Sequence, residues 1–240
     1  MIPAYNRGAC VHEALRSVLD QTFTDFQVLV VDDGSTDGTA QIVEEYSAVD
    51  LRIKLVRQQH RGAASARNAA IQLPGKHEYV SFLDSDDIWF PMHLERAIQA
   101  LRTNPEAGVY FSAVEIQNNN ASWSAERLNA QLQQQSTPIV MANRSLPGGF
   151  YLLDAATCRK ALIMSLFVPM TPSVVVRRRA VARSPWFNCN LMVMEDSDLL
   201  LFLAGAGYSY VFDEQASVRV RRFGDNVSGR GLSQLAWSGG

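Results

Sequence analysis

The sequence predicts an α/β fold in which helices flank a mostly parallel central sheet. Strand-like and helix-like segments alternate through about the first hundred residues, which is the pattern of parallel βαβ units. Residues 26–31 form a near-continuous apolar, β-branched run, as expected for a strand that is buried on both faces. With 240 residues and a hydrophobic content of 47%, the chain has enough apolar side chains for one core.

Each element of the first half has a local reason. Residues 1–2 end a strand, and a helix follows in which apolar side chains recur at helical spacing: Val11, Leu15, Val18 and Leu19. After the strand at 26–31, the polar side chains at 35–37 are suitable caps for a helix near Ile42. Apolar runs predict the remaining elements of this half: strands at 53–56 and 79–83, and a helix at 64–71.

The second half is less regular. Apolar side chains after Pro91 predict another helix: Leu94, Ala97, Ile98 and Leu101. Residues 117–135 are rich in Asn, Gln, Ser and Ala with little apolar periodicity, and we interpret them as an excursion over the active face of the sheet. The remaining patterns predict strands at 108–116, 173–176 and 208–213, a helix at 159–166, and a helix at 197–206 that glycines terminate.

Composition limits the classes of partner. The net charge of −2 gives no overall attraction to nucleic acid or to an anionic membrane, so nucleic acid is not expected as a partner. Cys10, Cys158 and Cys189 lie far apart and lack metal-ligand spacing, which predicts reduced thiols. The start of the chain shows no signal peptide, and the apolar stretch 161–170 is too short to span a bilayer. We expect a cytoplasmic protein, with peripheral contact at the inner face of the membrane left open.

The most informative segment is the acidic run Asp-Ser-Asp-Asp at 84–87, which follows the apolar run 79–83. Hard cations such as Mg²⁺ and Mn²⁺ take oxygen ligands, and Mg²⁺ is commonly held by one or two carboxylates together with phosphate oxygens of a substrate. Asp84 and Asp86 at a strand end therefore indicate a site for a nucleotide diphosphate. The alternative is that these residues cap the helix that follows Pro91.

A second acidic strand end favours the first interpretation. Asp32 and Asp33 directly follow the strand at 26–31. In open α/β sheets, ligands bind outside the carboxyl ends of the strands, so we expect both acidic ends to face one crevice. The alternative here is an Asx turn that caps the next helix, and it explains Asp37 better than Asp33.

Several segments, in order along the chain, resemble motifs of the family 2 glycosyltransferases, which have the GT-A fold: Pro-Ala-Tyr-Asn at 3–6, then 17–23, 30–37, 62–68, 82–87, 195–198 and 225–228. The resemblance covers nearly the whole chain. It implies a single GT-A domain over 1–240 with a Rossmann-like central sheet. Residues 1–116 would be the nucleotide-sugar-binding half, and 117–240 the acceptor-binding half that carries the catalytic base.

The resemblance also implies roles on the donor side: Pro3, Ala4, Tyr5 and Asp33 against the nucleotide base, Arg67 facing the nucleotide, Asp84 facing the ribose, and Asp86 ligating Mn²⁺ or Mg²⁺. The chemistry is suitable, because an aromatic ring can stack on uracil and a carboxylate can accept a hydrogen bond from its imide N–H. The alternative for Tyr5 is a half-buried packing residue, and the alternative for Arg67 is a surface ion pair.

On the acceptor side, the resemblance makes Asp196 the base that removes a proton from the acceptor hydroxyl. Glu195 would contact the acceptor. The alternative for Asp196 is an N-terminal cap of the helix behind it, a place that the helix macrodipole favours for a carboxylate.

The chain departs from the family pattern at both ends. Phe223 stands where a histidine usually assists the metal or the diphosphate. Either Arg221 or Arg222 partly replaces that help as a phosphate clamp, or the affinity for the metal is weaker. Relatives carry more apolar strand residues before the Pro-x-Tyr turn, which implies a shortened central strand or a start assigned too late. A C-terminal acceptor-binding extension of some relatives would be missing after Ser228.

Together with the resemblance, the sequence predicts an inverting, metal-dependent glycosyltransferase that moves a sugar from a nucleotide diphosphate, a UDP-sugar, to a hydroxyl of a glycan or lipid-linked acceptor. Two alternatives stay open. One is a nucleotidyltransferase, although the segment 6–9 is a poor match to its Gly-rich phosphate loop. The other is a sugar-nucleotide binding module with weakened catalysis. The sequence predicts neither donor sugar, acceptor, linkage nor oligomeric state.

Overall fold

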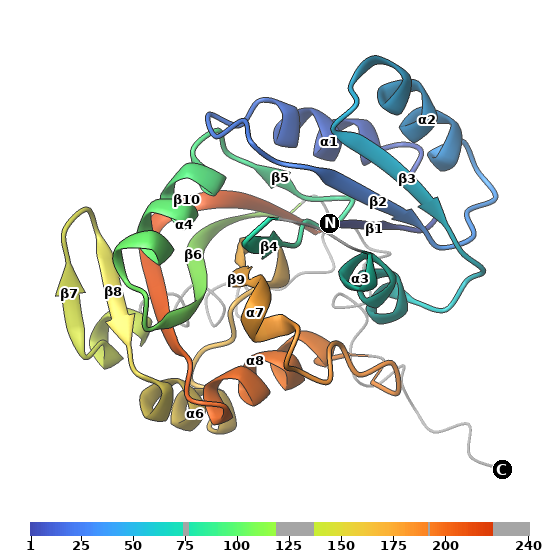
Figure 1. The fold of residues 1–240 in the computed structure, drawn as a ribbon. Helices are drawn as coiled ribbons and strands as arrows, with labels where there is room; N and C mark the ends of the chain where they lie inside the picture. Colours follow the sequence, from blue (N-terminus) through green and yellow to red (C-terminus); the bar gives the residue numbers. More distant parts are fainter. Residues whose placement is uncertain (74–76, 119–136, 192, 223–240) are drawn as a thin grey trace, which may run out of the picture.

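The computed structural model describes residues 1–73, 77–118, 137–191 and 193–222 (Figure 1). Most of the predicted excursion at 117–135, together with Phe223 and the motif at 225–228, lies outside the described residues. The elements in chain order are β1 (Ile2–Ala4), α1 (Val11–Leu19), β2 (Val28–Asp32), α2 (Thr39–Val49), β3 (Ile53–Arg57), α3 (Ala63–Gln72), β4 (Tyr79–Ser81), β5 (Ile88–Trp89), α4 (His93–Thr103), β6 (Ala107–Asn118), β7 (Arg144–Leu146), β8 (Phe150–Leu153), α6 (Ala155–Ile163), η1 (Thr171–Ser173), β9 (Val175–Arg177), α7 (Arg178–Val181), α8 (Glu195–Gly205) and β10 (Ser209–Arg222).

The strands form two sheets that meet at Met1. β1, β2 and β3 are parallel, with Ile2 opposite Val30. The second sheet has the order β4-β9-β6-β10-β8-β7, and β5 pairs with β10. Met1 donates from its amino group to the Ser81 carbonyl at 2.8 Å, and its own carbonyl accepts from Leu83 N at 3.0 Å. This pattern is that of parallel neighbours, so the end of β1 lies beside the end of β4 and the two sheets join into one continuous surface.

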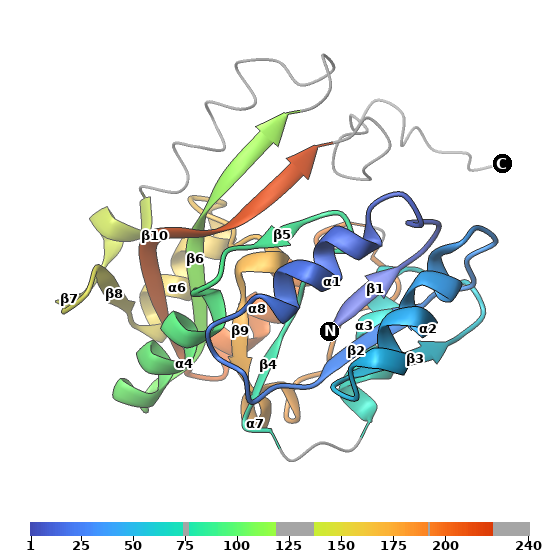
Figure 2. The ribbon, with the colours of Figure 1, turned by 90° about the horizontal axis from the view of Figure 1, so that it is seen from above.

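Helices cover both faces of this surface (Figure 1). On one face, α1 and α2 pack over β2, and apolar side chains of α4 and β10 join the same core. On the other face, α3 packs against Val31, while α6, α7 and α8 share a core with β6 and β9. Figure 2 shows β6 and β10 side by side, in agreement with their long parallel register. The α/β class with flanking helices is confirmed.

The second sheet differs from the mostly parallel sheet that the alternation of elements predicts. β9 runs antiparallel to both β4 and β6, and β5 and β8 run antiparallel to β10. The alternation is confined to the first part of the chain. β9 pairs with β4 and β6 across long connections in sequence, which do not fix the direction of pairing. β7 and β8 are antiparallel neighbours joined by a short turn, in which Gly148 and Gly149 have φ of 85° and 79°. The sheet is therefore mixed.

Two elements have bounds that differ from the predicted ones. The helix expected at 159–166 is α6, which begins four residues earlier because the Asp154 carboxylate caps it, accepting from Thr157 N at 2.7 Å. The last strand, expected at 208–213, continues to Arg222. Its second half alternates apolar and charged side chains, as a strand does when its two faces have different surroundings.

Polar side chains in α1 and directly after it hold the segment that follows the acidic run 84–87. Ser17 Oγ accepts from Trp89 N at 3.2 Å. Gln21 donates to the Phe90 carbonyl at 2.8 Å and accepts from Leu94 N at 3.0 Å. These buried bonds fix β5 and the start of α4, and they hold the acidic run against the end of the sheet.

His93 begins α4 and is fully buried, with its Nδ1 at 2.7 Å from Ser217 Oγ. Ser217 Oγ in turn donates to Ser112 Oγ at 2.7 Å. His93 Nε2 has no hydrogen-bond partner among the described residues. Burial lowers the pKa of His93 to about 3, so the imidazole is neutral in the folded protein.

We expect the fold to lose stability as the pH falls below the ordinary pKa of histidine. Between that value of 6.5 and about 3, the unfolded chain binds a proton that native His93 does not bind. The free energy of unfolding should fall by about 2 kcal/mol between about pH 7 and about pH 5 from this group alone. Urea denaturation of wild type and His93→Gln at both pH values measures it. Equal pH slopes for the two proteins would contradict the assignment.

Candidate active site

The site lies where the carboxyl ends of β1, β2 and the segment after β4 meet. β1 is parallel to β2, with Ala4 opposite Asp32, and it is joined to residues 81–83 by the bonds of Met1. The acidic segments after β2 and after β4 therefore emerge at the same edge of the sheet. This is the shared edge that the two acidic strand ends predict.

Asp33 holds the turn at 58–62 against the end of β2. Its carboxylate is 2% exposed and accepts from Gln58 Nε2 at 2.6 Å, Arg61 N at 2.9 Å and Gly62 N at 2.7 Å. His60 Nδ1 lies 2.8 Å from the same carboxylate. These contacts occupy most of the acceptor capacity of the carboxylate. Its predicted contact with a nucleotide base stays a prediction.

Tyr5 is 41% exposed at the end of β1 and stacks on His60, with ring centroids 3.9 Å apart and planes 21° from parallel. Pro3 and Ala4 are buried within β1, and the Ala4 carbonyl accepts from Asp33 N at 2.8 Å. Tyr5 is thus the member of the Pro-Ala-Tyr segment that offers a side chain to a ligand.

The loops after β1 and β2 are tied to each other. Asn6 Oδ1 accepts from Thr36 N at 2.9 Å, and the Asp37 carboxylate accepts from Gly8 N at 3.0 Å and from Thr39 N at 2.9 Å. Burial would raise the pKa of Asp37, but the bonds from Thr39 and Gly8 outweigh it and lower the pKa. Asp37 therefore has the structural role that its position before α2 indicates.

The acidic run after β4 concentrates negative charge. The Asp84 side chain is 33% exposed, whereas Asp86 and Asp87 are 8% and 3% exposed. Burial and the charge of Asp84 raise the pKa of Asp86, and Arg7, 3.9 Å away, opposes this. Burial, Asp84 and Asp86 raise the pKa of Asp87, whose carboxylate accepts from Arg221 N at 2.8 Å. A nearby cation would favour the ionised form of all these groups.

This donor set suits a divalent cation that is shared with a substrate. Among the described residues, no group of three or more Asp, Glu, His or Cys side chains gathers to hold an ion by itself. One or two carboxylates completed by phosphate oxygens are the usual protein share of a Mg²⁺ site. Asp84 and Asp86 fit that requirement, and Asp87 is engaged with β10.

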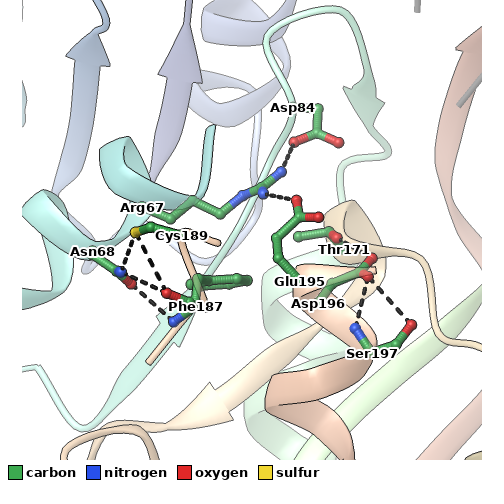
Figure 3. Close-up of polar contacts among 9 residues, drawn as sticks. All are labelled: Arg67, Asn68, Asp84, Thr171, Phe187, Cys189, Glu195, Asp196 and Ser197. Carbon is green, nitrogen blue, oxygen red and sulfur yellow. Dashed lines mark hydrogen bonds and ion pairs between the residues drawn. The ribbon is translucent and has the colours of Figure 1, made fainter. Parts of the chain in front are cut away.

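Arg67 lies at the centre of the site and is 4% exposed (Figure 3). Its Nη2 donates to Asp84 Oδ1 at 2.6 Å, and its Nη1 donates to Glu195 Oε1 at 2.9 Å. Burial would lower the pKa of Arg67, but Asp84 and Glu195 outweigh it and raise the pKa. One guanidinium therefore joins the acidic run after β4 to the first residue of α8.

Asp196 lies in the first turn of α8 (Figure 3). Its Oδ2 accepts from Thr171 Oγ1 at 2.7 Å, and its Oδ1 accepts from Ser197 N at 2.7 Å. The residue at the N-cap position is Met194, which supplies no capping side chain. Burial raises the pKa of the neighbouring Glu195, Arg67 lowers it, and Asp196 raises it further.

Arg221 and Arg222 end β10. Arg221 is 6% exposed, donates from Nε to the Asp86 carbonyl, and forms an ion pair with Glu13. Arg222 Nη2 lies 4.0 Å from Met170 Sδ. In this structure Arg221 supports the main chain of the acidic run, and a role of either arginine as a phosphate clamp stays a prediction.

Some residues of the site carry no motif. Gln58, His60, Thr171 and Phe187 were not singled out in the sequence. His60 lies two residues before Gly62 of a predicted motif, which is a weak signal. Thr171 and Phe187 have none, because their partners Asp196 and Arg67 are distant in sequence.

The family model described as "Glycosyl transferase family 2" matches residues 1–167. This chain belongs to that family. The match confirms the resemblance that the ordered motifs indicate. The division of a glycosyltransferase domain into halves at 116 and the individual site residues stay predictions.

Curated relatives match part of this family 2 chain. A UDP-Glc:alpha-D-GlcNAc-diphosphoundecaprenol beta-1,3-glucosyltransferase of Escherichia coli, WfgD, is 39% identical over 122 residues, which are 50% of this chain and 47% of that protein. Chondroitin synthase of Escherichia coli is 39% identical over 101 residues, which are 42% of this chain and 15% of that protein. The chain spans less than half the length of these relatives.

Solved structures match over nearly the whole chain. TarS of S. aureus in complex with UDP-GlcNAc has a TM-score of 0.69 at 22% identity, covering 92% of this chain and 57% of TarS. A mannosyltransferase of Pyrobaculum calidifontis with GDP-Man and Mn²⁺ has a TM-score of 0.62 at 19% identity, covering 92% and 55%. At these identities the likeness shows the fold, which is the expected one. Each helix in the described part of the chain is too short or too polar to cross a bilayer.

Removal of the Asp33 carboxylate should destabilise the fold, because the buried donors of the 58–62 turn lose their acceptor. We expect Asp33→Ala to lower the free energy of unfolding by about 2–3 kcal/mol. Asp20→Ala removes an exposed carboxylate and should change it by less than about 0.5 kcal/mol. Urea denaturation measures both, and equal midpoints for the two variants would show that Asp33 does not hold the turn.

Proposed function

We propose that this chain is the catalytic part of an inverting, metal-dependent glycosyltransferase. It moves a sugar from a nucleotide diphosphate donor, a UDP-sugar, to a hydroxyl of a glycan or lipid-linked acceptor. The observation that carries the proposal is the bridge through Arg67, which joins Asp84 to Glu195 at 2.6 Å and 2.9 Å. This bridge brings the acidic strand end and the start of α8, with Asp196, to one place.

The names of similar proteins support the choice of substrates. WfgD is named as a transferase from UDP-Glc to a diphosphoundecaprenol-linked sugar, and TarS was solved with UDP and with UDP-GlcNAc. A UDP-linked donor and a lipid-linked acceptor are therefore the combination that we propose for this chain. Location at the inner face of a membrane would follow from such an acceptor.

On the donor side, Tyr5 offers its exposed ring to the nucleotide base. Asp33 shapes the same end of the site through the 58–62 turn, and Asp84 faces the ribose. Asp86, with Asp84 beside it, would hold Mn²⁺ or Mg²⁺ together with the diphosphate. When bound, this cation supplies positive charge to the departing nucleoside diphosphate.

On the acceptor side, Asp196 takes the proton from the attacking hydroxyl, and the hydroxyl oxygen attacks the anomeric carbon from the side opposite the nucleotide. Thr171 and Ser197 fix the orientation of its carboxylate through bonds of 2.7 Å each. The anomeric C–O bond to the diphosphate breaks as the new C–O bond forms. This single displacement inverts the anomeric centre.

The role of Asp196 has a direct test. With Mn²⁺ and an acceptor, Asp196→Asn should lower kcat by about 10²–10⁴-fold while UDP binding stays within about twofold, because a carboxamide cannot accept the proton. Asp198→Asn, in the same turn of α8, is the matched control and should keep most of the activity. Release of UDP from a panel of UDP-sugars measures the rate.

Three outcomes decide the function. Loss of UDP release in Asp196→Asn, with release retained in the wild type and in Asp198→Asn, supports glycosyl transfer. Release of pyrophosphate in place of UDP would mean nucleotidyl transfer. UDP binding without turnover in the wild type would reduce the chain to a binding module.

Metal dependence has its own test. We expect UDP together with Mn²⁺ to raise the melting temperature of the wild type by several degrees more than UDP or Mn²⁺ alone, since each completes the ligands of the other. Asp86→Asn should abolish this increment and leave the effect of UDP alone unchanged. EDTA added to the wild type is the control. An increment that EDTA removes but that survives in Asp86→Asn would exclude Asp86 as a ligand.

A further inference from the structure

Arg67 is surrounded by protein groups, although the resemblance to the family implies that it faces the nucleotide. The side chain is 4% exposed. Its two terminal nitrogens are engaged with carboxylates of Asp84 and Glu195, and the Phe187 ring lies beneath the guanidinium with its centroid 5.3 Å away. Its Nε is buried and has no hydrogen-bond partner among the described residues. A nucleotide base would have to displace one of the carboxylates to reach it.

The next residue of α3, Asn68, fastens the segment that leads to α8 (Figure 3). Its Nδ2 donates to the Phe187 carbonyl at 2.8 Å, and its Oδ1 accepts from Phe187 N at 2.9 Å. The two consecutive residues of α3 thus hold Phe187 by its ring and by its main chain. Since this segment precedes α8, α3 restrains the helix start at two points.

The charges around Arg67 explain why a positively charged side chain is needed at this position. Asp84 belongs to the acidic run after β4, and Glu195 and Asp196 begin α8. Without a positive charge between them, these carboxylates would repel each other across the site, and Glu195 would be left half-buried and unpaired. The planar guanidinium is suited to bridge two carboxylates at a fixed separation, because its donors form a rigid fork.

We infer that Arg67 is a positioning residue: it sets the separation between the donor-side carboxylate Asp84 and the helix start that carries Asp196, without contacting the nucleotide. This inference rests on the proposed function. It assigns Arg67 an effect on the rate of transfer at saturating donor and little effect on donor binding.

The test separates binding from turnover. Arg67→Met keeps the length of the side chain and removes its charge. We expect kcat to fall by about 10²-fold, since a displacement of about 1 Å can cost that much, while the Kd for UDP with Mn²⁺ stays within about twofold. Arg67→Lys supplies a point charge without the fork and should restore kcat in part. Isothermal titration with UDP and steady-state rates of transfer give the two quantities.

A matched control removes a comparable ion pair outside the site. Arg96 donates to both oxygens of the fully buried Asp213 at 2.6 Å each. Arg96→Met should destabilise the fold in urea to a similar extent and leave kcat unchanged. A loss of kcat in Arg67→Met alone therefore comes from position within the site and not from lower stability.

A double-variant cycle keeps the inference testable if Arg67→Met does not fold. Arg67→Lys and Glu195→Gln both weaken the same bridge, so the double variant should lose much less than the product of the two single losses.

An increase of about tenfold or more in the Kd for UDP, with kcat unchanged, would show that Arg67 contacts the nucleotide and would overturn the inference. Unchanged kcat in Arg67→Met, or independent effects in the cycle, would do the same. If the wild type itself neither transfers nor releases a sugar, the proposed function fails first. That result is distinct, because it is seen before any variant is made.

Discussion

The buried guanidinium of Arg67 is the interaction on which the geometry of the site depends. A buried ion pair contributes little net stability, because the cost of removing both charges from water offsets their attraction. Its effect is on arrangement: with Asp84 on one side and Glu195 on the other, the parts of the site that come from β4 and from α8 have one allowed separation. Three leucines of α8 are buried in the core, and this packing keeps the helix from moving away from Arg67: Leu199, Leu200 and Leu203.

The polar and aromatic side chains at the carboxyl edge of the sheet fall into two groups, those that hold the loops and those that stay exposed. One group accepts hydrogen bonds from main-chain N–H groups of neighbouring loops: Asp33, Asp37 and Asn6. These bonds hold the loops at this edge in place without a ligand. Tyr5 and Asp84 are left with exposed surface at the same edge. Such a division reduces the entropy lost when a donor binds, because the loops are already ordered.

Local patterns predicted much of the fold. The helix with Val11, Leu15 and Val18 and the buried strand at β2 are found as expected, because one strong periodicity or apolar run decides each of them. The antiparallel direction of β9 depends on contacts with β4 and β6 that no local pattern encodes. The same holds for the site. Acidic strand ends predicted a shared edge, but the hydroxyl of Thr171 on Asp196 could not be predicted, since it comes from a region without a motif.

The charge balance of the site connects the proposed donor to the proposed cation. Burial and mutual repulsion already raise the pKa of Asp86, Asp87 and Glu195, with Arg67 and Arg7 as nearby positive charges. A diphosphate arriving alone would add negative charge beside Asp84 and Asp86, and two carboxylates alone offer a hard cation too few oxygens. Each therefore lowers the electrostatic cost of binding the other. Because Arg67 is engaged with Asp84 and Glu195, it is not the counter-charge for the diphosphate in the proposed mechanism, where the cation supplies positive charge instead.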